Sequence, residues 1–355
     1  VQGFGPRRRM LPKDCVLYCP VVPTVDSRAP AWCERTRHPM SKPDLVLLHA
    51  PSVYDFRETS IMYGPVSDLV PSSPIFEMYP LGFTTIAEYM ERHGLYVRLV
   101  NLAVRMLHTP KYDVERAIRE MDPVAFGIDL HWAPHAHGSI EIARICKKYH
   151  PNTPVVFGGF TASYFHEELA GYDCVDYVIR GDSTEEPFTR LIYALKRGGS
   201  VADIPNVTYK DASGAVVVNE LSYVPDTFNH VNLDYSFSMR SVIRDRDMVS
   251  ALPFKGWLSY PVSASLTCRG CTRNCVTCGG SATAFRTHYG RDRVAFRDPE
   301  LLVRDIAHIG RHIPGPVFVL NDFRQAGDDY VHEFITGLKR IDFRNPIGFE
   351  FFTPP

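Results

Sequence analysis

The chain has 355 residues, with 39 basic and 40 acidic side chains and a net charge of −1. This balance gives the whole chain no electrostatic attraction for nucleic acids or membranes, so neither is an expected partner. No run of roughly 18 apolar residues occurs, which argues against a membrane-spanning helix. The chain begins at Val1 without an initiator Met or an apolar signal segment, and we expect a trimmed end and a cytoplasmic protein.

Residues 1–43 show no clear periodicity and are predicted to form an irregular N-terminal arm. The arm contains three cysteines that we expect to be plain thiols rather than metal ligands, because no matching fourth ligand stands out. These cysteines are Cys15, Cys19 and Cys33.

From Asp44 to residue 198, short apolar runs alternate with segments of helical periodicity. Pro80 opens a predicted helix that Gly94 closes, and Ser183 and Glu186 have the spacing of a capping box. Five such units predict an α/β fold with a doubly wound, mostly parallel sheet, whose ligands bind at the carboxyl ends of the strands. The predicted strands span residues 45–49, 96–100, 124–128, 154–157 and 175–179.

Residues 199–260 are predicted to be a linker with a β-hairpin that turns at Ser213 and Gly214. From residue 261 the alternation returns, and three strand–helix units are too few to close a barrel. Residues 261–355 are therefore expected to be the N-terminal part of a longer barrel domain. Its predicted strands span 262–267, 317–320 and 347–352, and its helices lie near 299–312 and 328–340.

Four cysteines fall within residues 268–278, too close together for all of them to pair without strain. We therefore expect a metal site in a reduced compartment. Cys271, Cys275 and Cys278 directly follow a predicted strand, and three thiolates on one tight loop can hold three irons of a [4Fe–4S] cluster. The fourth iron would stay open for a substrate or a cofactor.

This loop resembles the signature of the radical S-adenosylmethionine (SAM) superfamily. The resemblance implies that the open iron binds SAM and that electron transfer yields a 5′-deoxyadenosyl radical. The loop departs from the pattern at Thr277, where the superfamily usually has an aromatic residue, and it has an additional cysteine, Cys268. A zinc knuckle with four sulfurs is the alternative, although zinc ribbons usually separate their cysteine pairs by about a dozen residues. We expect Cys268 to be a thiol at a strand end.

In that superfamily, later strands of the barrel contribute further contacts to SAM. Asp322 follows the second predicted barrel strand and is a candidate partner for the ammonium group; a helix cap is the alternative. Glu350 lies in the third predicted strand, where a buried carboxylate would need a partner. Four arginines after the cluster could neutralise the SAM carboxylate, but we expect most of them to be solvated: Arg286, Arg291, Arg293 and Arg297.

A five-unit α/β domain before such a barrel resembles the cobalamin-dependent radical SAM family. The resemblance implies a flavodoxin-like cobalamin-binding domain at residues 44–198, with the long segment 50–80 covering the corrin. Gly158 and Gly159 would let the backbone approach a bulky ligand, although a tight turn alone would also use them. Gly181 and Asp182 match a segment that the family carries after the fifth strand.

After the third strand, Asp129 and His131 fit part of the motif Asp-x-His-x-x-Gly, in which the aspartate orients a cobalt-ligating histidine. Pro134 occupies the glycine position, and the family often binds cobalamin without a histidine on the metal. We therefore expect both residues to line the cofactor and leave cobalt ligation open. Loop histidines bonded to water or backbone are the alternative.

The resemblance implies an enzyme with three cofactors: a [4Fe–4S] cluster, SAM and cobalamin. The expected reaction is methylation of an unactivated carbon of a small molecule, lipid or peptide, with electrons from a donor such as ferredoxin or flavodoxin. Two alternatives stay open. One is cyclisation or ring rearrangement with the same cofactors, and the other is a non-catalytic cobalamin-binding protein with a structural zinc knuckle.

Overall fold

The computed structural model describes residues 42–58, 78–233 and 235–353. The described residues all belong to one compact unit, residues 42–355, and residues 1–41 lie outside the description. The predictions for Cys15, Cys19 and Cys33, and for most of the loop before Pro80, therefore concern residues outside the description. No helix in the described part is both long enough and apolar enough to cross a membrane.

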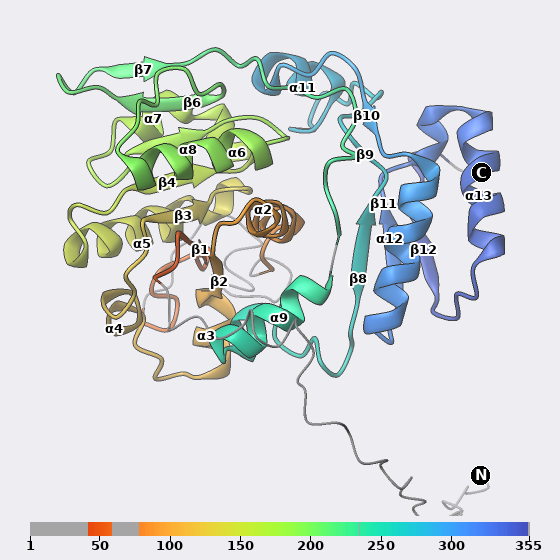
Figure 1. Ribbon diagram of the computed structural model, residues 1–355, viewed down its shortest axis with the longest axis horizontal. Coiled ribbons are helices and arrows are strands. Elements are labelled where there is room, and N and C mark those ends of the chain that lie inside the picture. The colour runs from red at the N-terminus through yellow and green to blue at the C-terminus, as the bar shows by residue number, and fades with distance from the viewer. Residues whose placement is uncertain (1–41, 59–77, 234, 354–355) are drawn as a thin grey trace, which may run out of the picture. The chain divides into compact units, whose positions relative to one another are not determined.

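Seven strands form the larger sheet, in the order β2-β1-β3-β4-β5-β6-β7 (Figure 1). The first five are parallel and match the five predicted strands within a few residues. Their order, 2-1-3-4-5, is that of flavodoxin-like doubly wound sheets, so the predicted fold class is confirmed. The strands are β1 Leu45–His49, β2 Val97–Asn101, β3 Ala125–Asp129, β4 Val155–Gly158 and β5 Tyr177–Ile179.

Alternate residues of β1 enter different cores, because successive side chains of a strand point to opposite faces. Leu45 and Leu47 pack in the core under α2 (Leu81–Arg92) and α8 (Glu185–Arg197). Val46 and Leu48 pack in the opposite core, under α4 (Val114–Arg119) and α5 (Ala136–Tyr149). Burial on both faces explains why the strand is a continuous apolar run. Shorter helices complete this region: α3 Leu102–His108, η2 Ala133–His135, α6 Phe160–Tyr164 and α7 His166–Ala170.

The predicted hairpin forms and extends the same sheet. Strand β6 (Val207–Lys210) pairs antiparallel with β5, and β7 (Val216–Val218) pairs antiparallel with β6. The rest of the predicted linker contains α9 (Tyr235–Asp245) and α10 (Met248–Ala251), both of which contact β2. Only two side chains of α9, Phe237 and Ser241, are buried.

The second sheet is parallel, in the order β12-β11-β8, as expected for successive strand–helix units. Strand β8 leads through a two-stranded ribbon, β9 and β10, and helix α11 to α12, as Figure 1 shows. Both predicted helices of this region form with the expected bounds. The elements are β8 Ser263–Leu266, β9 Cys268–Arg269, α11 Ala282–Tyr289, β10 Ala295–Phe296, α12 Pro299–His312, β11 Val317–Leu320, η3 Phe323–Ala326, α13 Asp328–Arg340 and β12 Ile347–Phe349.

Candidate functional site

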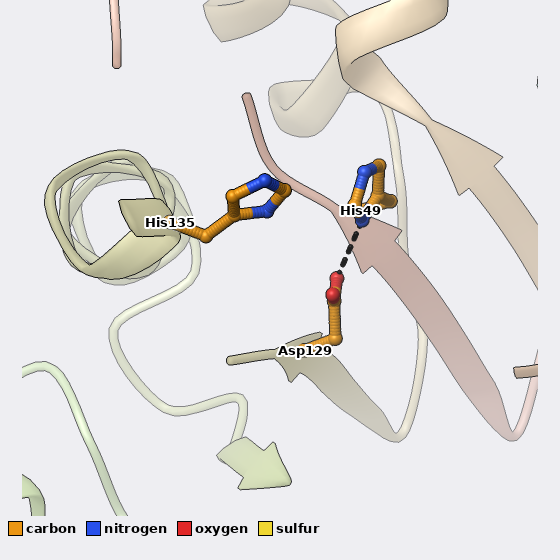
Figure 2. Close-up of side chains that lie close together, drawn as sticks. All are labelled: His49, Asp129 and His135. Carbon is orange, nitrogen blue, oxygen red and sulfur yellow. Dashed lines mark hydrogen bonds and ion pairs between the residues drawn. The ribbon is translucent and has the colours of Figure 1, made fainter. Parts of the chain in front are cut away.

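The carboxyl ends of β1 and β3 meet where the strand order of the large sheet reverses, which is the usual ligand position in such folds. His49 is the last residue of β1 and Asp129 the last residue of β3. The Nδ1 atom of His49 and Oδ1 of Asp129 lie 2.9 Å apart, and both side chains are buried (Figure 2). Of the predicted cobalamin residues, Asp129 therefore lies at the expected edge.

In the motif Asp-x-His-x-x-Gly the aspartate would orient His131, but here the carboxylate of Asp129 bonds His49. Paired residues of neighbouring parallel strands point the same way, which brings the side chain of His49, one residue beyond the Leu48–Ile128 pair, next to that of Asp129. The sequence signal that we missed is the histidine that ends β1. His135, at the start of α5, lies beside it, with 5.2 Å between the two ring centroids.

The imidazole of His131 is packed among aromatic rings. It lies 4.8 Å from the ring of Phe160 and 5.4 Å from that of Trp132, between centroids. Burial lowers the pKa of His131 below its usual value of 6.5, so the ring is neutral at pH 7. Its nitrogens bond no group among the described residues. Its role as a cofactor contact stays a prediction.

The two glycines after β4 have a structural explanation. Gly159 has a φ of +112°, and a Cβ there would lie 2.8 Å from the carbonyl of Leu130. The turn is fixed on the preceding loop, since Thr161 Oγ1 donates to the carbonyl of His131 at 3.0 Å. Gly158 ends β4, and a Cβ there would lie 3.0 Å from Ile179. Gly159 is therefore required by the packing of the chain, whether or not a ligand approaches it.

The turn after β5 forms buried ion pairs with the segment around the cysteines. Asp182 pairs with Arg291, which it bonds at 2.9 Å through Oδ1 and also through Oδ2. Arg269 bonds Glu185 at 2.5 and 3.0 Å. Both carboxylates bond arginines here, so the predicted cobalamin contact at Asp182 now has another explanation. Gly181, with a φ of +109°, makes the turn, and its contact with cobalamin stays a prediction.

The predicted capping box of α8 is wrong. The helix begins after Thr184, and no side chain caps it. Ser183 Oγ instead accepts hydrogen bonds from Arg269 at 3.0 Å and from Arg291 at 3.2 Å. Arginines that are distant in the sequence compete successfully for this hydroxyl.

The three predicted cluster cysteines lie on one loop between β9 and α11. Cys275 and Cys278 are exposed, Cys271 is partly exposed, and all three are free thiols. Backbone N–H groups point at two of the sulfurs: Arg273 donates to Cys271 Sγ at 3.3 Å and Gly280 to Cys278 Sγ at 3.4 Å. Such N–H···S bonds are a known means of tuning the potential of an iron–sulfur cluster.

Cys268 has a different environment. It is buried in an apolar cluster with Phe228 and Val231, and burial raises its pKa to about 12. A tetrahedral zinc site needs sulfurs roughly 3.8 Å apart, as Zn–S bonds of about 2.3 Å require. Among the described residues, no such set of cysteine sulfurs lies within 4.8 Å. The role of Cys268 as a thiol and not a zinc ligand stays a prediction.

The two predicted SAM residues lie near each other but differ in environment. Asp322 is buried and caps η3; both of its oxygens bond Arg324, and one accepts the N–H of Phe352 at 3.0 Å. The hydrogen bonds from Arg324 lower its pKa. Glu350 is exposed and lies just after β12, contrary to the expectation of a buried strand position, and it accepts the N–H of Asn321 at 2.8 Å. Because the carboxylate of Glu350 is exposed to solvent, its charge needs no partner within the protein.

The expectation that most of the four arginines are solvated is wrong for two of them. Arg291 bonds Asp182 as described, and Arg297 is buried against Asp305 at 2.5 Å. Arg286 and Arg293 are exposed.

Phe160 joins the carboxyl edge of the large sheet to the cysteine segment. Its ring contacts His131 on one side, and the rings of Phe285 and Tyr289 in α11 at centroid distances of 5.7 and 4.8 Å. Helix α11 begins four residues after Cys278. The structure therefore brings the expected corrin edge and the cysteine loop to neighbouring positions.

The chain is similar to proteins of known families. Residues 72–191 match the B12 binding domain family, within the region predicted to bind cobalamin. The hopanoid C-3 methylase of Methylococcus capsulatus is 27% identical, over 72% of this chain and 44% of that protein. The cytidylyl-2-hydroxyethylphosphonate methyltransferase of Streptomyces wedmorensis is 21% identical, over 79% of this chain and 58% of that protein. The chain thus spans about half the length of these curated relatives.

Two solved structures share the fold. The radical SAM methyltransferase TsrM from Kitasatospora setae, solved with tryptophan and a SAM analogue, has a TM-score of 0.57 at 16% identity, over 83% of this chain and 50% of that one. The cobalamin-dependent SAM radical enzyme OxsB, solved with aqua-cobalamin and SAM, has a TM-score of 0.59 at 14% identity, over 87% of this chain and 38% of that one.

Proposed function

Taking this chain as a member of the cobalamin-dependent radical SAM family, we propose that it is part of a methyltransferase that acts on an unactivated carbon. The observation that carries the proposal is the position of Phe160, which contacts both His131 at the sheet edge and the helix that follows the cysteine loop. Two cofactors bound at these two places would be neighbours, as a reaction that uses both requires. The relatives named as methyltransferases favour methyl transfer over ring formation.

The cysteine loop fits a [4Fe–4S] cluster. Three free thiols stand on one short loop, with backbone N–H groups directed at two of them. The loop is also anchored: the backbone N–H and hydroxyl of Thr272 donate to Gln325 at 2.9 and 2.6 Å. We propose that Cys271, Cys275 and Cys278 hold three irons and that a ferredoxin or flavodoxin supplies electrons from the exposed side of the loop. Such thiolate ligands suit the reduced conditions of the cytoplasm.

The sheet edge fits a corrin. A neutral imidazole, His131, and the rings of Phe160 and Trp132 form an apolar surface beside the carboxyl ends of the parallel strands. We propose that these side chains line the cobalamin and that Gly181 lies near its polar groups. Asp129 does not orient His131, so a cobalt-ligating role for that histidine has no structural support.

When bound, the cluster and SAM would supply a carbon-centred radical, and cobalamin would supply the methyl group. The residues of the chain position these cofactors. Glu350, an exposed carboxylate that accepts one hydrogen bond from the described residues, is the proposed contact for the ammonium group of SAM. Asp322 is a positioning residue, because its hydrogen bonds fix Arg324 and the backbone at Phe352 on either side of this region. Phe160 and Tyr289 exclude water between the two sites.

The test is turnover of the anaerobically reconstituted chain with SAM and a reductant. We expect 5′-deoxyadenosine and S-adenosylhomocysteine in comparable amounts when a methyl acceptor is present. Deoxyadenosine without S-adenosylhomocysteine would indicate cyclisation or rearrangement instead. A preparation that contains zinc and no iron after reconstitution would contradict the proposal outright.

A further inference from the structure

Buried carboxylates in this protein almost always have a cationic partner. Counted over the whole residue, seven Asp and Glu among the described residues are buried, at 1–7% exposed, and six of them form an ion pair with Arg or Lys. The six pairs are Asp44–Lys196, Glu88–Arg92, Glu185–Arg269, Asp247–Arg105, Asp305–Arg297 and Asp322–Arg324. The seventh carboxylate, Asp129, has no Arg or Lys partner in the described part of the chain.

Asp129 is 4% exposed, and its carboxylate bonds only one described group, the imidazole of His49. Its Oδ2 atom accepts no hydrogen bond from any described residue. A buried charge is costly unless it is paired or coordinates a metal ion. Among the described residues, no arginine or lysine balances the charge of Asp129, and its partner His49 balances it only when protonated.

The side chains around Asp129 are those that bind transition metals. His49 and His135 are 0% and 1% exposed, and one ligand atom from each of the three residues lies within 4.8 Å of the other two. Figure 2 shows the three side chains converging from three elements: the end of β1, the end of β3 and the turn that begins α5. Two imidazoles and one carboxylate are a donor set found in catalytic zinc and non-haem iron sites.

One partly exposed aromatic side chain contacts the proposed ligands at His135. The ring of Trp132 lies edge-on to that of His135, 5.8 Å between centroids, and Trp132 is 37% exposed. His135 therefore lies beside one partly exposed side chain of the loop after β3.

We propose that His49, Asp129 and His135 bind a divalent transition-metal ion, zinc by preference, at the strand ends. Zinc is bound more tightly than iron(II) by N and O donors of this kind. The ion neutralises Asp129 and ties the ends of β1 and β3 to the start of α5. This site is separate from the cysteine loop, shares no ligand with it, and does not depend on the proposed function.

The experiment measures metals in the cobalamin-free chain, incubated with zinc sulfate and desalted, by mass spectrometry. The background is a variant in which Cys271, Cys275 and Cys278 are replaced by Ser, so that the loop cannot bind zinc. We expect about one zinc per chain in this background, and a rise of the melting temperature on adding zinc. Asp129→Asn and His135→Gln should each lose the zinc and the rise, while His332→Gln, an exposed control, should keep both.

Two results would overturn the proposal: no zinc and no change of melting temperature in the background variant, or zinc that Asp129→Asn and His135→Gln both retain. A far-ultraviolet circular dichroism spectrum of each variant, compared with the background, shows whether it is folded. If either Asp129→Asn or His135→Gln is unfolded, the zinc content of the other variant tests the proposal. Iron content of the chain with its cysteines intact is measured separately, so failure of the zinc site and failure of the proposed function give different results.

Discussion

Buried carboxylates stand at two points on the same edge of the large sheet, and they are neutralised differently. After β5, Asp182 and Glu185 pair with Arg291 and Arg269, which lie 109 and 84 residues away in the chain. After β3, the carboxylate of Asp129 bonds one imidazole and no other group among the residues that the structure describes. At the turn after β5, two arginines neutralise the carboxylates, and these ion pairs hold the cysteine segment against the sheet. The carboxylate of Asp129, after β3, can still bind a cation, which is why we propose a metal ion at that position.

The largest expected effect on stability is at the turn after β5, where Glu185 pairs with Arg269. Glu185→Gln keeps the size of the side chain but leaves Arg269 as a buried charge without a carboxylate. We expect the free energy of unfolding to fall by roughly 3–5 kcal/mol, measured by urea denaturation of the apoprotein. The control is Glu120→Gln, which removes the exposed pair with Arg116 and should cost less than about 1 kcal/mol. Equal losses in the two variants would contradict the structural role of Glu185.

The same pair predicts a pH dependence. Burial alone would raise the pKa of Glu185, but Arg269 and the hydrogen bonds lower it below the ordinary value of 4.5. The folded protein therefore binds fewer protons here than the unfolded chain, so the stabilisation is complete above about pH 5 and is lost as the pH falls below 4.5. Denaturation at about pH 6 and about pH 3.5 should show a smaller acid loss in Glu185→Gln than in the wild type. Parallel losses would argue against the shift.

A smaller effect is expected at the turn after β4. Gly159→Ala places a Cβ against the carbonyl of Leu130 and should destabilise by roughly 1–3 kcal/mol. The matched control is Gly198→Ala, which also has a positive φ, of +67°, but open space around a Cβ, so it should cost about 1 kcal/mol. The difference between the two melting temperatures isolates the close approach. No difference would mean that the loops after β3 and β4 are not packed as described.

The smallest effect on stability is expected at His131. Its half-buried ring bonds no described group, so His131→Ala should change the free energy of unfolding by about 1 kcal/mol or less. Loss of the ring should weaken cobalamin binding by roughly tenfold, which equilibrium dialysis of the cobalamin-free chain can measure. The control is again His332→Gln, which lies on α13 and should bind cobalamin as the wild type does. Unchanged affinity in His131→Ala would remove this residue from the corrin site.

The sequence predicted the elements whose signal is local. The apolar runs gave β1 and β11 with the observed bounds, and the periodicity gave α12 and α13. It could not predict interactions between distant residues. Arg269 and Arg291, for example, donate hydrogen bonds to the hydroxyl of Ser183, which therefore does not form the capping box. The partner of Asp129 was missed for the same reason, because a motif within the loop suggested His131 while strand pairing placed His49 there.

The central claim is that three cysteines hold a cluster beside a corrin edge. It is tested most directly by iron content and 5′-deoxyadenosine formation in the anaerobically reconstituted chain and in its Cys275→Ser variant, with Cys268→Ser as the matched control. We expect about four irons per chain and deoxyadenosine in the wild type, both lost in Cys275→Ser and both kept in Cys268→Ser. Deoxyadenosine formation by Cys275→Ser at the wild-type level would contradict the account.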